Sequence, residues 1–262
     1  MKIICICTKS LTFNTFLKSQ TDYLAKKGFH IKVACSDVER LNLKNNLQYK
    51  ISFPNTIIQL FNIFKYIEIF NQINTLVEKN PTALFYLHTP LASHIFRLFT
   101  FFRKLKIIYF VHGFRFTSKT NLLKKFFFKS IEQILSIKTP IFITINNEDY
   151  NFVKFNLKKN SRCYKINGVG LNLPRTHLKK KITNKNCIKK ILVIAAYKKE
   201  KGYLEILKVA EMLKNKKIKI ECFGYGNYDK FNLIKIEKKL NNISFNNFDI
   251  NLDSKIKNYD IL

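Results

Sequence analysis

The chain has 262 residues, which suits one large or two small domains, and its 47% hydrophobic content is enough for a real core. Its 47 Lys and Arg residues against 17 Asp and Glu give a net charge of +30. This charge favours an anionic partner such as nucleic acid, anionic lipid or a phosphorylated substrate. Compositional bias that places Lys on solvated faces explains the charge equally well.

Cysteine spacing and apolar run lengths exclude several classes of protein. The six cysteines include neither a CxxC pair nor a Cys/His cluster with zinc spacing, so no metal site is predicted. Their usage favours a reducing compartment, with Cys5 and Cys7 on one face of a strand as small core residues. No apolar run reaches the length of a bilayer span, and the first residues do not have the pattern of a signal peptide.

The hydrophobic pattern predicts strands that alternate with helices, which is typical of an α/β fold. Strands are expected at 2–8, 29–35, 82–87, 107–111, 141–145, 161–166, 191–195, 218–223 and 243–245, and the start of another at 259–262. Helices are expected at 11–27, 56–79, 91–104, 120–137, from 146 onward, 201–215 and 228–240. Residues 36–55 are expected to be irregular. The first loop has no GxGxxG, so the nicotinamide-type fingerprint is absent.

The segment 106–116 organises the fold. Its apolar run ends at His112-Gly113, which indicates a buried parallel strand with its loop at the carboxyl edge of the sheet. Ligands bind at that edge in open α/β sheets, and Gly113 allows close approach of the backbone. Two interpretations of His112 compete: a polar group at a ligand site, or a strand-end residue with a local hydrogen bond.

Composition also divides the chain. The span 172–189 contains Pro174, many lysines and few apolar residues, so it is interpreted as a linker. It separates a first domain, 1–171, from the beginning of a second α/β unit, 190–262.

Several segments, taken in order, match one pattern. They are His88-Thr89-Pro90-Leu91-Ala92-Ser93 with Arg97, Val111-His112-Gly113-Phe114-Arg115-Phe116, Glu132, Thr144-Ile145-Asn146-Asn147-Glu148-Asp149-Tyr150, Asn167-Gly168-Val169-Gly170, Lys201-Gly202 and Gly224-Tyr225-Gly226. Together they resemble the retaining GT-B glycosyltransferases of family four, in particular the bacterial polysaccharide enzymes. The resemblance implies two Rossmann-like parallel-sheet domains, of which the second is incomplete here, facing across a cleft.

The resemblance also implies roles for residues of the second domain. Lys201, followed by Gly202, matches a lysine that contacts the donor diphosphate. Expected at the start of a helix, it would combine an ammonium with the helix dipole; the alternative is one more solvated lysine. Gly224 and Gly226 suit either close approach of the backbone to a nucleotide or a tight turn.

In the first domain, His112 matches the histidine that faces the transferred sugar. The loop after the first strand, with Thr8 and Ser10, is expected near the diphosphate and the acceptor. Arg115 is a candidate for an acceptor phosphate, with a plain surface arginine as the alternative. Glu148 and Asp149 are interpreted as acidic residues in the first turn of a helix whose N-terminus Asn146 caps, and not as a general base.

Two departures from the family pattern stand out. Many relatives carry an arginine five residues before the lysine, where this chain has Ala196. The family's donor motif of two glutamates would follow a strand such as 259–262, where this sequence stops. The sequence therefore predicts a C-terminally truncated enzyme or one part of a split enzyme.

The resemblance implies retaining transfer of a sugar from a nucleoside-diphosphate sugar. The acceptor would be a polyprenyl-linked saccharide of capsule, O-antigen, lipopolysaccharide or exopolysaccharide synthesis. No cofactor or metal is implied, because lysine, arginine and helix N-termini stabilise the leaving diphosphate. The basic aromatic helices 91–104 and 120–137 suggest a peripheral position on the cytoplasmic membrane face, unless phenylalanines such as Phe96, Phe99 and Phe126 pack in the core.

Two rival functions remain. One is an inactive fragment or a non-catalytic subunit of a split enzyme, which the expected truncation suggests. The other is nucleic-acid binding, which only the charge suggests. No RNA- or DNA-binding motif is present, so no nucleic-acid partner is predicted.

Overall fold

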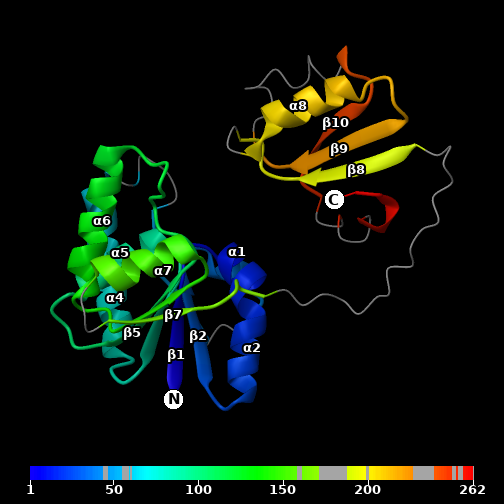
Figure 1. Ribbon diagram of the computed structural model, residues 1–262. Helices are drawn as coiled ribbons and strands as arrows, with labels where there is room; N and C mark the ends of the chain where they lie inside the picture. Colours follow the sequence, from blue (N-terminus) through cyan, green and yellow to red (C-terminus); the bar gives the residue numbers. More distant parts are fainter. Residues whose placement is uncertain are drawn as a thin grey trace. The chain divides into compact units, whose positions relative to one another are not determined.

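The computed structural model describes residues 1–43, 47–54, 59, 61–157, 161–170, 188–198, 201–226, 239–249, 252 and 256–261. The chain divides into two compact units, Met1–Leu173 and Pro174–Leu262, and each has a sheet of its own (Figure 1). The predicted linker 172–189 lies outside the described residues except for its last two positions. Of these, Lys189 already belongs to a strand, so the second unit's sheet begins two residues before the predicted strand 191–195.

The first unit contains seven parallel strands in the order β3-β2-β1-β4-β5-β6-β7. They are β1 (Lys2–Ile6), β2 (His30–Cys35), β3 (Gln48–Lys50), β4 (Leu84–Leu87), β5 (Lys106–Val111), β6 (Ile141–Thr144) and β7 (Arg162–Lys165). Six of these were predicted. The expectation that 36–55 is irregular is wrong for β3, which pairs with β2 through Val33 and Gln48. Strand β3 has only three residues, two of them polar, so it is too short to give an alternating hydrophobic pattern.

Helices connect these strands in the expected places. Their bounds are α1 (Ser10–Thr12), the π-helical turn η1 (Phe13–Leu17), α2 (Lys18–Lys26), the 3-10 turn η2 (Val38–Arg40), α4 (Ile63–Glu78), α5 (Pro90–Phe99), α6 (Leu122–Ser136) and α7 (Asn147–Asn156). The helix predicted from residue 56 begins at Ile63, after Asn62 caps it; residues 55–58 and 60 lie outside the described part. Asn146 caps α7 as predicted, because its Oδ1 accepts the Asp149 N–H at 2.8 Å.

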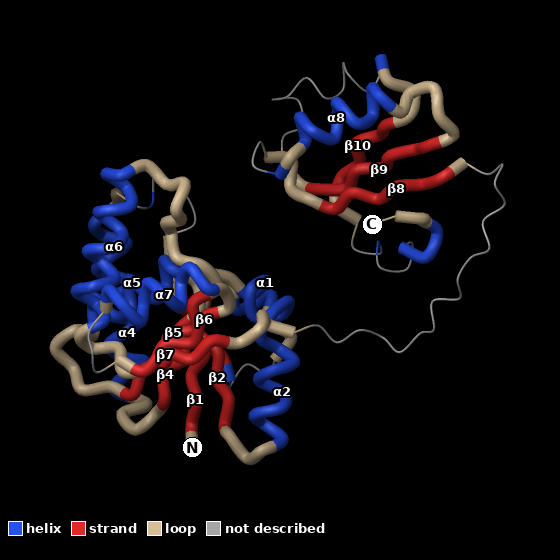
Figure 2. The backbone as a smooth tube through the Cα atoms, viewed as in Figure 1, coloured by secondary structure: helices blue, strands red, loops and turns tan. Residues whose placement is uncertain are grey.

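The two faces of the first sheet are both covered, which explains why its central strands are continuously apolar. Ile4 and Ile6 of β1 point into a core shared with α4, α5 and α7. Cys5 and Cys7 point to the opposite face, against Phe13 and Leu17 of the first helical segment. Figure 2 shows this arrangement, with helices on either side of the strands. The prediction that Cys5 and Cys7 share one face as core residues is confirmed.

The second unit has a three-stranded parallel sheet in the order β10-β9-β8. Its elements are β8 (Lys189–Ile194), α8 (Tyr203–Met212), β9 (Ile218–Gly224), β10 (Ile243–Asn247) and the short turn η6 (Ile256–Asn258). Ile261 forms a parallel bridge with Ile191 beside β8, where the start of a strand was predicted. The helix predicted at 228–240 falls almost wholly outside the described residues.

Candidate functional site

The first unit places its polar strand ends at one edge of the sheet. Strands β2 and β3 follow one another outward on one side of β1, and strands β4 to β7 follow one another outward on the other side. The strand order therefore changes direction between β1 and β4. Because the strands are parallel, the residues after β1, β4 and β5 emerge at the same carboxyl edge. In an open α/β sheet this reversal is where ligands bind. Thr8, His88 with Thr89, and His112 occupy these three positions.

The structure joins two of these residues directly. His88 Nδ1 lies 3.1 Å from His112 Nε2, a hydrogen-bond distance. His88 is fully buried, and His112 is half-buried beside the ring of Phe16, with centroids 6.3 Å apart. Burial lowers the pKa of His112 to about 4 and holds the pKa of His88 well below its ordinary value, with the neighbouring His112 adding to the effect. Both imidazoles are therefore neutral at physiological pH, so His112 is a hydrogen-bonding group and not a cation.

Thr89 has the unusual backbone of this edge. Its φ of 62° is positive, and it is the only such residue besides glycine in the described part of the chain. For a β-branched residue this conformation is strained, and such strain gathers at functional sites. The Thr89 Oγ1 accepts the Thr8 N–H at 3.2 Å and lies 2.7 Å from the Thr8 hydroxyl. These contacts tie the loop after β1 to the loop after β4.

The predicted phosphate-side residues of the first loop are already engaged within the protein. Ser10 is buried, and its N–H donates to Asp37 Oδ1 at 2.6 Å. Thr8 is half-buried and paired with Thr89, as above. The structure therefore brings Thr8 to the edge near His112 but withdraws the Ser10 side chain from the surface. Asp37, which sequence reasoning missed, supplies the carboxylate that holds this loop.

Arg115 follows β5 at the same carboxyl edge of the sheet as His112. Its side chain is exposed, with the guanidinium 5.9 Å from the centre of the Phe128 ring. Its neighbours Phe114 and Phe116 are buried and stack on each other, with centroids 5.3 Å apart. The two phenylalanines anchor the loop and leave the arginine at its surface.

A buried ion pair lies beneath this edge, between α5 and α6. Arg97 Nη2 is 2.8 Å from Glu132 Oε2, and His94 Nε2 is 2.7 Å from the other carboxylate oxygen. Burial alone would raise the pKa of Glu132, but Arg97 and the hydrogen bond from His94 hold it below its usual range. The Arg97 guanidinium also lies 4.5 Å from the centre of the Tyr109 ring on β5. Sequence resemblance drew attention to Arg97 and Glu132 without showing that they pair.

In the second unit, the predicted donor residues gather around the end of β8. The helix expected to open at Lys201 begins instead at Tyr203, because Gly202 adopts a left-handed conformation with φ 75° just before it. Lys201 is exposed, and its N–H donates to the Lys198 carbonyl at 3.0 Å. The lysine therefore precedes the helix rather than forming its first turn. The Tyr203 hydroxyl donates to the Ala195 carbonyl at 2.7 Å, which fixes the start of α8 against β8.

Gly224 ends β9 and Gly226 follows that strand, at the same edge of the sheet as the end of β8. A Cβ on Gly224 would sit 2.0 Å from the Ala195 carbonyl oxygen, so no larger residue fits there without a backbone shift. Gly226 has φ 123°, and the Tyr197 N–H donates to the Tyr225 carbonyl at 3.1 Å. Gly224 thus approaches Ala195, the residue that follows the neighbouring strand β8, and this contact supplies a structural reason for the glycine. Lys201, Gly202 and Gly226 lie in the loops at the carboxyl edge of this sheet, and Gly224 is the last residue of β9.

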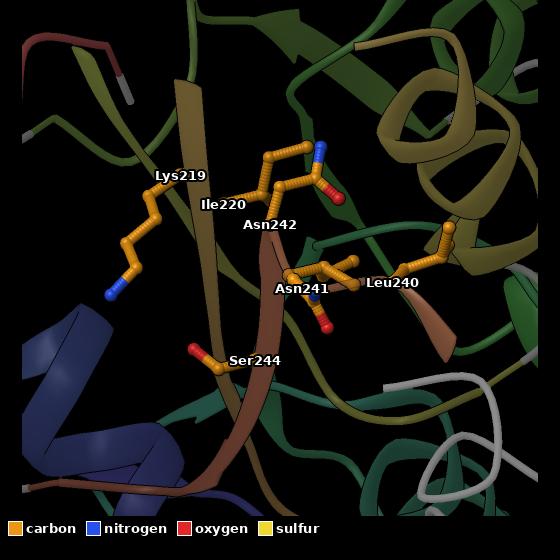
Figure 3. Close-up of a pocket in the computed structure, with 7 residues that line it drawn as sticks. Lys219, Ile220, Leu240, Asn241, Asn242 and Ser244 are labelled. Atoms are coloured by element: carbon orange, nitrogen blue, oxygen red, sulfur yellow. The ribbon is translucent and has the colours of Figure 1, made fainter. Parts of the chain in front are cut away.

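A hollow of about 280 Å³ lies at the opposite end of the same strands. Figure 3 shows its lining where β10 begins, with Leu240, Asn241 and Asn242 across from Ile220 of β9. The candidate donor residues are not among those that line it. Across the described residues, no group of three or more His, Cys, Asp or Glu side chains could hold a metal ion, and no helix is both long and apolar enough to cross a bilayer.

The chain belongs to the glycosyl transferase 4-like family, whose model matches residues 5–147. This segment contains the edge with Thr8, His88 and His112. The chain is 24% identical over 177 residues to EpsD of Bacillus subtilis (strain 168), which carries a provisional glycosyltransferase name. It is 30% identical over 188 residues to an uncharacterised 41.2 kDa protein in the cps region of Klebsiella pneumoniae. These alignments cover 66% and 68% of this chain but only 45% and 52% of the relatives, so the chain spans about half their length.

Solved structures show the fold. Sucrose-phosphate synthase from Thermosynechococcus elongatus gives a TM-score of 0.70 at 9% identity, covering 95% of this chain and 71% of that one. Anabaena HepE in complex with UDP-glucose gives 0.62 at 13% identity, covering 96% and 70%. UDP-N-acetylglucosamine 2-epimerase from Rickettsia bellii gives 0.56 at 15%, covering 94% and 68%. The predicted GT-B fold is confirmed. Because an epimerase has the same fold, the fold alone does not determine which reaction is catalysed.

Proposed function

We propose that this chain takes part in retaining transfer of a sugar from a nucleoside-diphosphate sugar to a membrane-linked saccharide, in bacterial polysaccharide synthesis. The observation that carries the proposal is the family match over residues 5–147, which includes the strand-end edge of the first sheet. The relative from a cps region supports the polysaccharide context. The complex of Anabaena HepE with UDP-glucose supports a nucleotide-sugar donor.

The geometry supports a division of roles. The neutral imidazole of His112 suits a hydrogen bond to a sugar hydroxyl, because it neither attracts nor repels the donor's charge. The exposed ammonium of Lys201, beside the N-terminus of α8, suits the diphosphate, whose developing charge an amine and a helix dipole stabilise. Arg115 suits an acceptor phosphate because its guanidinium is accessible. No metal or cofactor enters this proposal.

The membrane part of the proposal concerns the first two turns of α6. Leu122, Leu123, Phe126 and Phe127 are between 60% and 82% exposed, although apolar side chains of this size are usually buried. The exposed Lys124 lies among them. An apolar helix face bearing cations suits the interface of an anionic bilayer. The expected core packing holds for Phe96, which is buried, but not for Phe126.

Activity is tested by release of the nucleoside diphosphate from a panel of nucleotide sugars that includes UDP-glucose, with membrane extract as the source of acceptor. We expect release by the full chain, and a loss of tenfold or more in the His112→Asn and Lys201→Met variants. Lys198→Met, which removes a nearby exposed lysine, is the matched control and should retain the rate. If no donor in the panel is consumed, with or without the protein encoded next to this one, the enzymatic proposal fails in favour of a non-catalytic subunit.

Membrane binding is tested separately by co-sedimentation with phosphatidylcholine vesicles that contain or lack phosphatidylglycerol. We expect binding that needs the anionic lipid, weakens with salt, and is lost in the Leu122→Ser/Phe126→Ser variant. Phe155→Ser is the control, because Phe155 is 72% exposed on α7. Binding that is unchanged between low and high salt would refute the electrostatic part of the proposal. Equal binding by the Leu122→Ser/Phe126→Ser and Phe155→Ser variants would refute the assignment of the α6 face as the membrane-binding surface.

A further inference from the structure

The hydrogen bond between His88 and His112 restricts where the proton of each ring can lie. The two rings come from the ends of adjacent parallel strands, β4 and β5, and approach through His88 Nδ1 and His112 Nε2 at 3.1 Å. A neutral imidazole carries one N–H donor and one bare nitrogen. Since both rings are neutral, one of the two facing nitrogens must carry a proton and the other must accept it.

The surroundings of His88 decide between the two arrangements. Its other nitrogen, Nε2, is buried and has no hydrogen-bond partner among the described residues. The rings of Tyr86 and Phe110 flank it, with centroids 4.2 Å and 5.5 Å away. If His88 accepted the hydrogen bond, its proton would lie on Nε2, and a buried N–H would be left unpaired. Buried donors without partners are rarer than under-used acceptors, and the cost biases the equilibrium about tenfold or more.

We propose that His88 is a positioning residue that donates its Nδ1–H to His112 Nε2 and thereby holds His112 in the tautomer with its proton on Nδ1. His112 then offers an N–H donor from the part of its ring that does not face His88. The strained Thr89, next in the chain, and its contact with Thr8 fix the end of β4 and so the orientation of the His88 ring. Resting on the proposed function, the inference assigns His112 as a donor to a sugar hydroxyl oxygen rather than an acceptor.

The test is nitrogen-15 NMR of the imidazoles in the full chain. Long-range proton–nitrogen correlation distinguishes a protonated from a bare ring nitrogen, and the chain has only five histidines, so single substitutions assign the signals. We expect His112 to carry its proton on Nδ1 and His88 on Nδ1 as well. A proton on His112 Nε2 in the wild-type chain would overturn the inference without any mutation.

Two variants separate positioning from packing. His88→Phe keeps an aromatic ring but removes the donor, so the His112 tautomer should shift measurably toward Nε2–H. His88→Asn can turn its amide N–H toward His112 and should preserve more of the original tautomer. His30→Asn, which alters an exposed histidine on β2, should leave the His112 signals unchanged. An unchanged His112 tautomer in a folded His88→Phe variant would contradict the assignment.

The inference and the proposed function can fail independently. The tautomer is read from the free protein, whereas the function is read from donor consumption. The expected tautomer with no donor consumption would refute the function alone. Donor consumption with the proton on His112 Nε2 would refute the assignment alone.

Discussion

Replacing Arg97 with methionine should destabilise the first unit strongly. The guanidinium lies 2.8 Å from Glu132, and both side chains are at most 1% exposed, so their removal from water is nearly complete. Breaking a buried pair by removing one partner costs about 3–5 kcal/mol, because the remaining charge is left uncompensated. A domain's total stability is about 5–15 kcal/mol, so this single change would remove a large share of it.

The loss should also depend on pH. Without Arg97, burial raises the pKa of Glu132 above its value in the unfolded chain. A group whose pKa is higher in the folded chain than in the unfolded chain contributes least to the free energy of unfolding at high pH. The variant should therefore lose more stability at pH 8 than at pH 5. His94 Nε2 remains 2.7 Å from the carboxylate, so one hydrogen bond to Glu132 is kept in the variant.

Urea denaturation followed by circular dichroism measures the effect. Arg97→Met/Glu132→Leu removes both charges and should recover much of the loss, since apolar replacement of a buried pair is often neutral. Lys18→Met is the control, because the Lys18–Asp22 pair is exposed and should contribute less than about 1 kcal/mol. If Arg97→Met costs no more than Lys18→Met, or if the double variant is less stable than Arg97→Met, the reasoning about this pair is wrong.

Two further predictions follow from the strand ends. Between pH 6.5 and 4 the unfolded chain binds a proton at His112 that the folded chain does not. The free energy of unfolding should therefore decrease as the pH is lowered from 6.5 to 4, by about 2 kcal/mol after allowing for partial exposure of the ring. His112→Asn should reduce this slope in urea titrations, and an equal slope would contradict the lowered pKa. Gly224→Ala should destabilise the second unit by more than about 2 kcal/mol, because its Cβ would meet the Ala195 carbonyl at 2.0 Å. Hydrogen exchange should show faster exchange in β8 and β9 but not in β4 or β5, whereas a glycine kept only for a ligand would leave both sheets unchanged.

The sequence predicted the strand ends well because apolar runs bounded by polar residues mark buried parallel strands. It therefore placed His112 at the carboxyl edge, and it placed Asn146 correctly as a cap. It could not show that His88 meets His112, since that contact depends on β4 and β5 being neighbours in the sheet.

Other features escaped prediction for physical reasons. Arg97 and Glu132 lie on separate helices, and charged helical residues are normally solvated, so only tertiary packing reveals their pairing. Asp37 comes from a segment without periodicity, and its contact with Ser10 depends on the loops after β1 and β2 lying together. Lys201 was placed at a helix start, but the left-handed Gly202 delays the helix to Tyr203.

The binding site for the nucleotide sugar can be mapped directly by titrating the full chain with UDP-glucose and following the NMR shifts of its backbone amides. We expect shifts at the carboxyl edges of the sheets, at Gly113 in the first unit and at Gly202, Gly224 and Gly226 in the second. We also expect the Lys201→Met variant to show weaker shifts in the second unit. Shifts confined to the hollow beside Asn242, or saturable shifts that His112→Asn and Lys201→Met both leave unaltered, would contradict the proposed binding site.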